Sequence, residues 1–175
     1  MISKIKCALL LASFCLASCA PPTLYVATNP VVNERMKSAK IVFGRPAEMS
    51  ISYKVYPGQT QQAALKSATD RIEQITKAVE NHVPAQLASA LQKKGVVPGP
   101  DVIISLRPTS GWGETNTTPR IQLEVSVQAS DRTKQPWIAR ISDGSWAEHT
   151  TAKQTAQIFT DRIVLELAKG GFVPQ

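Results

Sequence analysis

The stretch RIQLEVSVQA, residues 120–129, decides the fold class of this chain. Apolar side chains occupy every second position, and polar side chains occupy the positions between them. Because successive side chains of a strand point to opposite faces, this pattern predicts a β-strand with one buried face and one open face. A strand of this kind needs a covering layer on its apolar side, and the rest of the chain has to supply it.

Three more strands are predicted from similar patterns. Residues 137–141 alternate in the same way and follow a turn-forming stretch at 130–135, which predicts an antiparallel hairpin with residues 120–129. The other two strands are predicted at 49–56 and 102–106. The face of the sheet away from the core should then carry Ser52, Lys54, Tyr56, Gln122, Glu124, Ser126, Gln128 and Arg140.

Two helices should cover the sheet. An apolar stripe at helical spacing predicts a helix over 60–82 that begins at the N-cap Thr60. Pro84 interrupts the stripe, which resumes until Lys93-Lys94-Gly95, so the pattern indicates either one long helix kinked near Val83 or two helices in succession. A second stripe predicts the last helix over 151–169, capped by Thr150 or Thr151 and stopped by Gly170-Gly171.

The predicted order is therefore strand, helix, three strands, helix. An alternating sheet and two amphipathic helices predict a two-layer α+β sandwich, with a mostly antiparallel sheet of about four strands and both helices on one face. This domain should span residues 40–175, which is enough chain for one compact core.

The amino terminus reads as an export signal over residues 1–18. Lys4 and Lys6 form a positive region, residues 7–16 form an apolar run, and the small residues Ala17 and Ser18 follow. This arrangement is typical of a secretory signal peptide, and the run is shorter than the roughly 20 residues that cross a bilayer.

The tetrad Leu16-Ala17-Ser18-Cys19 resembles the lipobox of bacterial lipoproteins. The resemblance implies cleavage before Cys19, attachment of diacylglycerol and fatty acid such as palmitate to that residue, and stable anchoring, since two or more acyl chains hold a protein on a bilayer. Ala20 stands where an inner-membrane retention signal would carry aspartate, which implies the outer membrane with the domain facing the periplasm. The alternative is an ordinary signal with a chance cysteine.

Residues 19–39 should form a lipidated tether, stiffened by Pro21-Pro22 and broken at Asn29-Pro30.

The whole chain has 20 basic and 13 acidic residues, a net charge of +7, and loss of two lysines with the signal leaves +5. A modestly basic domain suits acidic partners or phosphate-rich lipid headgroups, and nucleic acid is not expected in this compartment. The alternative is an ordinary solvated surface. Basic residues gather early, at Arg35, Lys37, Lys40, Arg45 and Lys54.

The element order is similar to that of small outer-membrane assembly lipoproteins such as the LptE family of lipopolysaccharide-assembly subunits. The resemblance covers roughly residues 40–170 at the level of elements only. It implies a role in assembling the envelope. Members of that family tend to carry a glycine-aromatic stretch after the lipidated cysteine, whereas this chain has Ala20-Pro21-Pro22 there, so that specific role is not assigned.

Nothing in the sequence assembles a set of catalytic or metal-binding residues. His82 and His149 lie far apart and lack the spacing of a metal site, and no cysteine is left in the mature domain, so neither a metal nor a cofactor is expected. Asp143, Ser145 and His149 fall within seven residues and leave a hydrolase as a remote alternative. The presence of Asp143 and Ser145 beside Gly144 is also typical of a turn. We therefore expect that the protein is not an enzyme.

The long connection at 107–119 is the candidate binding element. Trp112 lies between two glycines, and an exposed tryptophan on a loop is a good binding anchor. The alternative is that Trp112 folds back over the sheet edge. Arg107, at the start of this connection, and Trp146 complete the predicted partner-binding set, whereas Trp137 should be buried in the core.

The leading hypothesis is an outer-membrane-anchored lipoprotein that binds another envelope protein and performs no chemistry. A second hypothesis is lipid or glycan binding through the basic residues and the aromatic connection.

Overall fold

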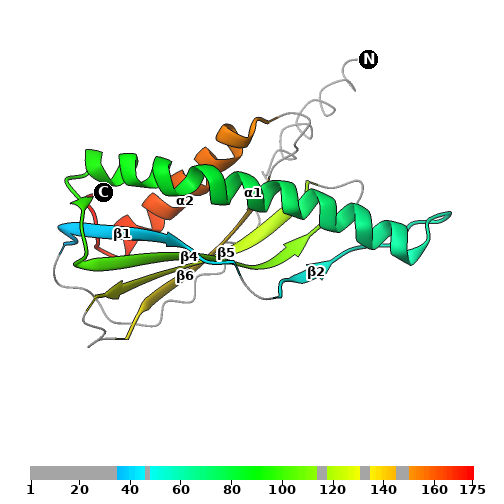
Figure 1. The fold of residues 1–175 in the computed structure, drawn as a ribbon, viewed down its shortest axis with the longest axis horizontal. Helices are drawn as coiled ribbons and strands as arrows, with labels where there is room; N and C mark the ends of the chain where they lie inside the picture. Colours follow the sequence, from blue (N-terminus) through cyan, green and yellow to red (C-terminus); the bar gives the residue numbers. More distant parts are fainter. Residues whose placement is uncertain (1–34, 46–47, 114–117, 131–134, 145–149) are drawn as a thin grey trace, which may run out of the picture.

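The computed structural model describes residues 35–45, 48–113, 118–130, 135–144 and 150–175 of the chain. Six strands and two helices follow one another along the sequence, as Figure 1 shows. Their order is β1 (Ser38–Phe43), β2 (Ser50–Ser52), α1 (Gln61–Lys93), β3 (Val97–Pro98), β4 (Val102–Trp112), β5 (Arg120–Ala129), β6 (Trp137–Gly144) and α2 (Ala152–Lys169).

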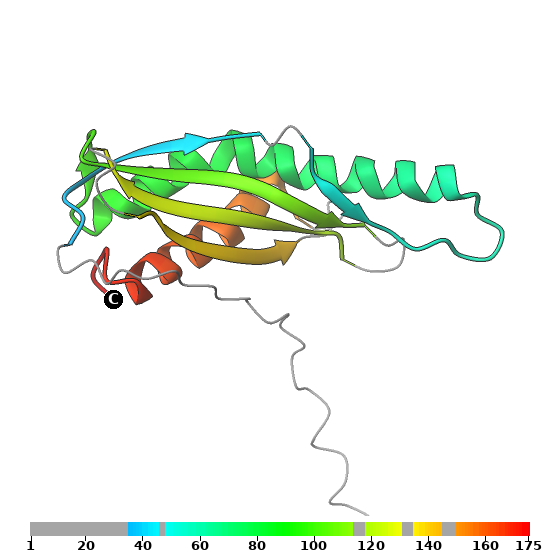
Figure 2. The same ribbon diagram turned by 90° about the horizontal axis from the view of Figure 1, so that it is seen from below.

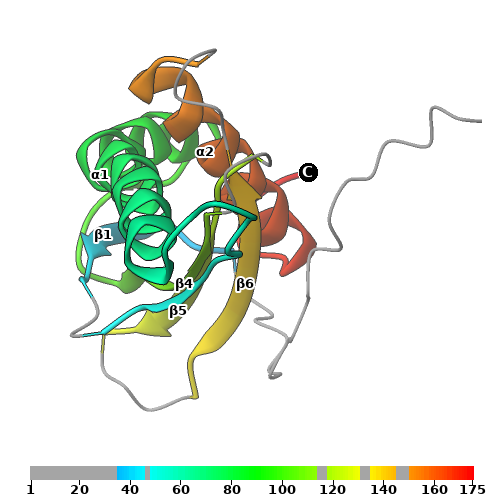
Figure 3. The same cartoon turned by 90° about the vertical axis from the view of Figure 1, so that its right-hand side faces the viewer.

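The helices and the sheet form two layers. Both helices lie on the same side of the sheet, which Figure 3 shows end-on, and they also pack on each other. The predicted α+β sandwich with two helices on one face is therefore confirmed. Its core combines residues of both layers, and the largest side chains that are fully buried include Ile72 and Leu87 of α1, Phe159 of α2 and Leu123 of β5.

The sheet is mixed and has six strands, so the predicted sheet of about four mostly antiparallel strands was wrong. The strand order is β3-β1-β4-β5-β6, and β2 pairs with β4 as well. β4, β5 and β6 are antiparallel neighbours as predicted. By contrast, β1 pairs in parallel with both β3 and β4, and β2 pairs in parallel with β4. β2 lies within the strand predicted at 49–56, whereas β1 and β3 are too short to show the long alternation that reveals a strand in a sequence.

β4 changes partner half-way along its length. β1 pairs with residues 102–106 of β4, and β2 pairs with residues 110–112. The amide of Gly44 donates to the carbonyl of Leu106 at 2.9 Å, and the next donor from β4 toward β1 would be residue 108. That residue is a proline without an N–H, so the β1 ladder ends there, and the pairing with β5 is irregular between Pro108 and Ser110.

The long helix α1 runs without a break through Pro84. Thr60 caps it as predicted, because its side chain accepts a hydrogen bond from the amide of Ala63 at 3.2 Å. Of the two predicted forms, the structure has the single helix. Val83 and Leu87, on either side of the proline, are both fully buried. Their burial offsets the backbone hydrogen bond that Pro84 cannot donate to Glu80.

The second helix α2 begins with a complete capping box. Thr151 accepts a hydrogen bond from the amide of Gln154, and the Gln154 side chain accepts one from the amide of Thr151 at 2.8 Å. The chain then turns at Gly171, whose φ of 80° would be strained in a residue that has a side chain. Phe172 returns to the core, where its ring packs edge-on against the ring of Trp137 with 5.2 Å between the ring centres.

The domain begins earlier in the chain than predicted, and the strand predicted at 49–56 is shorter than predicted. Met36 is buried, and its amide donates to the carbonyl of Phe172, so residues that sequence reasoning assigned to the tether pack against the domain. β2 covers only residues 50–52 of the predicted strand 49–56. Lys54 and Tyr56 therefore lie beyond the strand, where the ammonium of Lys54 is 5.3 Å from the centre of the Tyr56 ring.

None of the helices in the described ranges combines the length and apolar character that crossing a membrane would require.

Two glycines at the end of β4 let α1 approach the sheet. A Cβ atom added at Gly111 would lie 2.7 Å from the side chain of Ile72, and one at Gly113 would lie 2.7 Å from the backbone of Ala68. Since a helix backbone cannot give way as a side chain can, the position of Gly113 sets the distance between α1 and this end of the sheet.

Replacement of Gly113 by alanine should therefore destabilise the fold by about 1–3 kcal/mol, because α1 has to shift away from β4. Gly44→Ala is the matched control, since a Cβ at Gly44 meets nothing within 4 Å and its backbone needs no positive φ. Urea denaturation measures both variants. Equal midpoints for the two variants would contradict the close approach of α1.

Candidate functional site

The face of the sheet turned away from the helices is the candidate site, and we call it the open face. Figure 2 looks at the sheet from this side, with the helices behind it, and no described helix or strand lies over it. Its strand residues alternate with buried core residues, as the pattern of β5 predicts. The open face consists of Lys40, Val42, Ser50, Ser52, Ile103, Ser105, Arg107, Ser110, Trp112, Arg120, Gln122, Glu124, Ser126, Gln128, Ile138, Arg140 and Ser142.

An ion cluster occupies the middle of the open face. The register places Arg107, Glu124 and Arg140 side by side on three neighbouring strands. The Glu124 carboxylate is 2.7 Å from Nη2 of Arg107 and 3.4 Å from Nε of Arg140. Only 13% of the Glu124 side chain is exposed, against 55% and 40% for the two arginines. One carboxylate therefore holds two guanidinium groups whose other N–H donors face outward.

The open face has an excess of positive charge. Lys40 and Arg120 lie toward its two ends, and neither has a carboxylate partner within the described ranges. The strands thus direct four cationic side chains and one carboxylate to this side. Guanidinium groups bind carboxylates and phosphates in a bidentate geometry, so this charge pattern suits an anionic partner.

Trp112 lies at the end of the open face near β2. It pairs with Arg120 on β5 and with Ser52 on β2, and 37% of its surface is exposed. The two flanking glycines point to the opposite side, against α1. Trp112 is therefore a strand residue on the open face, and it is not buried in the core.

The predicted loop at 107–119 is largely wrong, because β4 continues to Trp112. The proline, glycines and small polar residues of this stretch are typical of a connection. In the structure, Pro108 ends the pairing of β4 with β1, and the glycines allow α1 to lie close to β4. Arg107 and Trp112 are therefore held on one strand and one face. Trp137 is buried as predicted. Cys19 and Trp146 lie outside the described residues.

The residues of the hydrolase alternative are only partly described. The Asp143 carboxylate accepts hydrogen bonds from Arg162 at 3.3 Å and from the amide of Gly144 at 2.8 Å. Ser145 and His149 lie outside the described residues. No group of three or more histidine, cysteine, aspartate or glutamate side chains suited to a metal ion occurs in the part of the chain that the structure describes.

Comparison with solved structures gives distant similarities of fold. No protein-family model and no curated protein matches the chain in sequence. Among solved structures, a PelC dodecamer from Paraburkholderia phytofirmans is similar, with 13% identity, a TM-score of 0.40, and coverage of 88% of this chain and 100% of that chain. A Xanthomonas campestris protein of the family DUF330 is similar with 16% identity, a TM-score of 0.40, and coverage of 81% and 88%. Neither similarity is close enough to transfer a function or a residue role.

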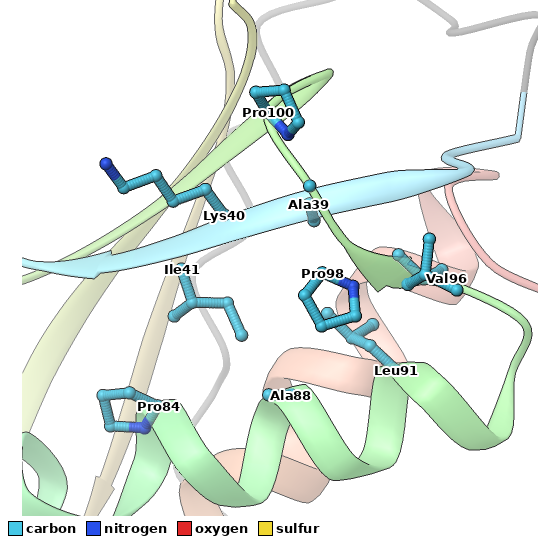
Figure 4. Close-up of a pocket in the computed structure, with 11 residues that line it drawn as sticks. Ala39, Lys40, Ile41, Pro84, Ala88, Leu91, Val96, Pro98 and Pro100 are labelled. Atoms are coloured by element: carbon cyan, nitrogen blue, oxygen red, sulfur yellow. The ribbon is translucent and has the colours of Figure 1, made fainter.

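Sequence reasoning missed a groove at the other edge of the sheet. It lies between β1, β3 and the second half of α1, as Figure 4 shows, and has a volume of about 400 Å³. Ile41 points toward α1 and Lys40 away from it. The lining is mostly apolar: Ala39, Lys40, Ile41, Pro84, Ala88, Leu91, Val96, Val97, Pro98, Gly99 and Pro100. The wall from β1 lies more than 40 residues away in sequence from the walls formed by α1 and β3, so no local pattern could have revealed the groove.

An ion pair joins the end of β1 to α1 beyond this groove. Nε of Arg45 donates to the Glu80 carboxylate at 3.0 Å, and a second guanidinium nitrogen contacts the same carboxylate. The hydrogen bond from Arg45 and its positive charge hold the pKa of Glu80 below its usual value, and Glu80 in turn raises the pKa of Arg45. Partial burial of Glu80 acts to raise its pKa, but the hydrogen bond and the positive charge of Arg45 outweigh this effect.

The lowered pKa of Glu80 gives a pH-dependent stability. A carboxylate whose pKa is lowered in the folded state stabilises the fold above its unfolded pKa of about 4.3, and this contribution is lost as the pH falls through the lower folded pKa. Glu80→Gln should therefore lower the melting temperature at pH 7, and the difference from the unchanged protein should shrink below about pH 4. Arg45→Gln should lower the melting temperature in the same way, and the double variant should melt no lower than either single variant. A difference that is the same at pH 7 and at pH 3 would contradict this assignment.

Proposed function

We propose that this protein is an outer-membrane lipoprotein, anchored through Cys19 and facing the periplasm, whose domain binds an acidic envelope protein on the open face and performs no chemistry. The lipobox-like tetrad at residues 16–19 supports the anchor. One observation carries the binding role: an uncovered sheet face on which four cationic side chains and an exposed tryptophan accompany a single carboxylate.

The ion cluster supports a rigid binding surface. Glu124 is held by two arginines of different strands, so the guanidinium groups of Arg107 and Arg140 have lost part of their rotational freedom before a partner arrives. Binding therefore costs less side-chain entropy than it would with free arginines. Trp112 adds apolar area at one end of the same face, as the anchors of protein interfaces commonly do.

Lipid or glycan binding is the second candidate, and it uses the same face. Guanidinium groups donate hydrogen bonds to phosphate as readily as to carboxylate, and an acidic lipid headgroup or an acidic sugar would contact the same cations. The protein partner is preferred because the charged side chains of the open face are spread over the neighbouring strands β4, β5 and β6, and because Trp112 lies at the end of this face near β2.

Two matched pairs of variants test the open face. Trp112→Ala and Arg120→Gln should each weaken binding of the partner, the first about tenfold or more and the second most strongly at low salt. Arg120→Gln leaves the ion cluster intact, because Arg120 has no ion-pair partner within the described ranges. The affinity is measured with the partner isolated by crosslinking to the intact envelope.

The controls change the same chemistry on the opposite layer. Leu165→Ala removes an exposed apolar side chain of α2 (45% exposed), and Lys153→Gln removes one exposed positive charge of α2. Both should leave the affinity unchanged. If Lys153→Gln weakens binding as much as Arg120→Gln, net charge rather than the open face determines binding. If vesicles of an acidic phospholipid bind the open face while no protein partner is captured, the second candidate replaces the first.

A further inference from the structure

Part of the outer edge of β1 has backbone amides and carbonyls that no described strand pairs with. Amides and carbonyls of a strand point alternately to its two sides. Those of Lys37 and Ala39 face β3, since their carbonyls accept hydrogen bonds from Val97 and Gly99. In the same series Ile41 and Phe43 face outward, but β3 ends at Pro98 and pairs only with Ser38 and Ala39. Among the described residues, no strand pairs with this edge beyond Ala39.

The apolar groove runs directly below this open edge. Ile41 forms its wall on the sheet side, and Pro84, Ala88 and Leu91 form its wall on the helix side. Val97, at the rim, is 54% exposed. A strand added to the edge of β1 would place every second side chain in this groove, and it would satisfy the outward amides and carbonyls at the same time.

We propose that residues 24–27 of the same chain, Leu24-Tyr25-Val26-Ala27, form this strand and pair antiparallel with residues 40–43 of β1. The segment is rich in β-forming side chains and is bounded by Pro22 and by Asn29-Pro30. In this register Val26 lies opposite Ile41, toward the groove, and Leu24 lies opposite Phe43 on the same side of the sheet, beyond the residues that line the groove. Tyr25 then lies opposite Val42, whose side chain is 38% exposed on the open face.

The length of the intervening chain permits this pairing. Met36 is fixed at the start of β1 by its burial and by its hydrogen bond to Phe172. The distance along β1 from Met36 to residue 40 is about 13 Å, whereas residues 28–35 span up to about 28 Å when extended. Asn29-Pro30 supplies the reversal that an antiparallel return requires.

Covalent attachment favours this segment over a peptide from another protein. A short flexible connection keeps an attached segment at an effective concentration near the millimolar range, and a free peptide would have to compete with it. The pairing itself does not depend on the proposed lipid anchor. Combined with that anchor, it leaves only residues 20–23 between Cys19 and the docked strand. The domain would then stay within about 15 Å of the bilayer, instead of at the end of a tether of up to about 55 Å.

Hydrogen–deuterium exchange of the purified full-length protein tests the pairing. The amides of Ile41 and Phe43 should be protected, and Leu24→Asp combined with Val26→Asp should speed their exchange about tenfold or more. Val31→Asp combined with Val32→Asp is the matched control, because it adds the same two charges to the same segment outside the proposed strand. Unchanged protection in β5 shows that the fold is intact. Exchange at Ile41 and Phe43 that is equal in all three proteins would overturn the proposal.

A photo-crosslinking side chain at Ala88, which is exposed at the groove, identifies the occupant directly. An adduct to residues 23–28 of the same chain supports the pairing. An adduct to a second copy or to a different protein would overturn it, whether or not Cys19 carries lipid. The outcome is therefore separate from that of the binding experiment on the open face.

Discussion

Among the described residues, the helices cover only one face of the sheet, and the rest of the structure depends on this constraint. Both helices pack on the same side of the six strands, and Phe159, Ile163 and Leu167 of α2 join Ile72, Val79 and Leu87 of α1 in burying that side. The other side must then be satisfied by its own polar groups. The cluster around Glu124 does this, since it pairs the central carboxylate with arginines from both neighbouring strands. Because two arginines pair with one carboxylate, the same cluster that stabilises this face also leaves it with an excess of positive charge.

β4 connects the groove beside β1 with the open face of the sheet. Its first half supports β1, whose outer edge and groove form one candidate surface, and its second half carries Arg107 and Trp112 on the other. Pro108 separates the halves, because it cannot donate to the next carbonyl of β1. Gly111 and Gly113 then bring α1 against the strand while Trp112 points away from the helix.

Local patterns predicted the elements that have long, regular alternation. Residues 120–129 form β5 with the predicted bounds, and the capped helix α2 and the antiparallel hairpin follow as expected. The parallel pairing of β1 could not be predicted, since it joins residues about 60 positions apart and leaves no local signal. The extension of β4 was missed because prolines and glycines indicate turns on average, whereas here they mark a ladder end and a helix contact. Alternation did place Glu124 and Arg140 outward, but only the register shows that Arg107 joins them.

The proposed attachment of the domain to a membrane through Cys19 would give these surfaces their biological setting. The most direct measurement is incorporation of labelled palmitate into the full-length protein expressed in a two-membrane bacterium, followed by fractionation of the envelope. We expect label on the unchanged protein in the outer-membrane fraction, and no label on Cys19→Ser, which should be released from the membranes. An unchanged protein without label, which distributes between fractions as Cys19→Ser does, would contradict a lipid-anchored binding domain.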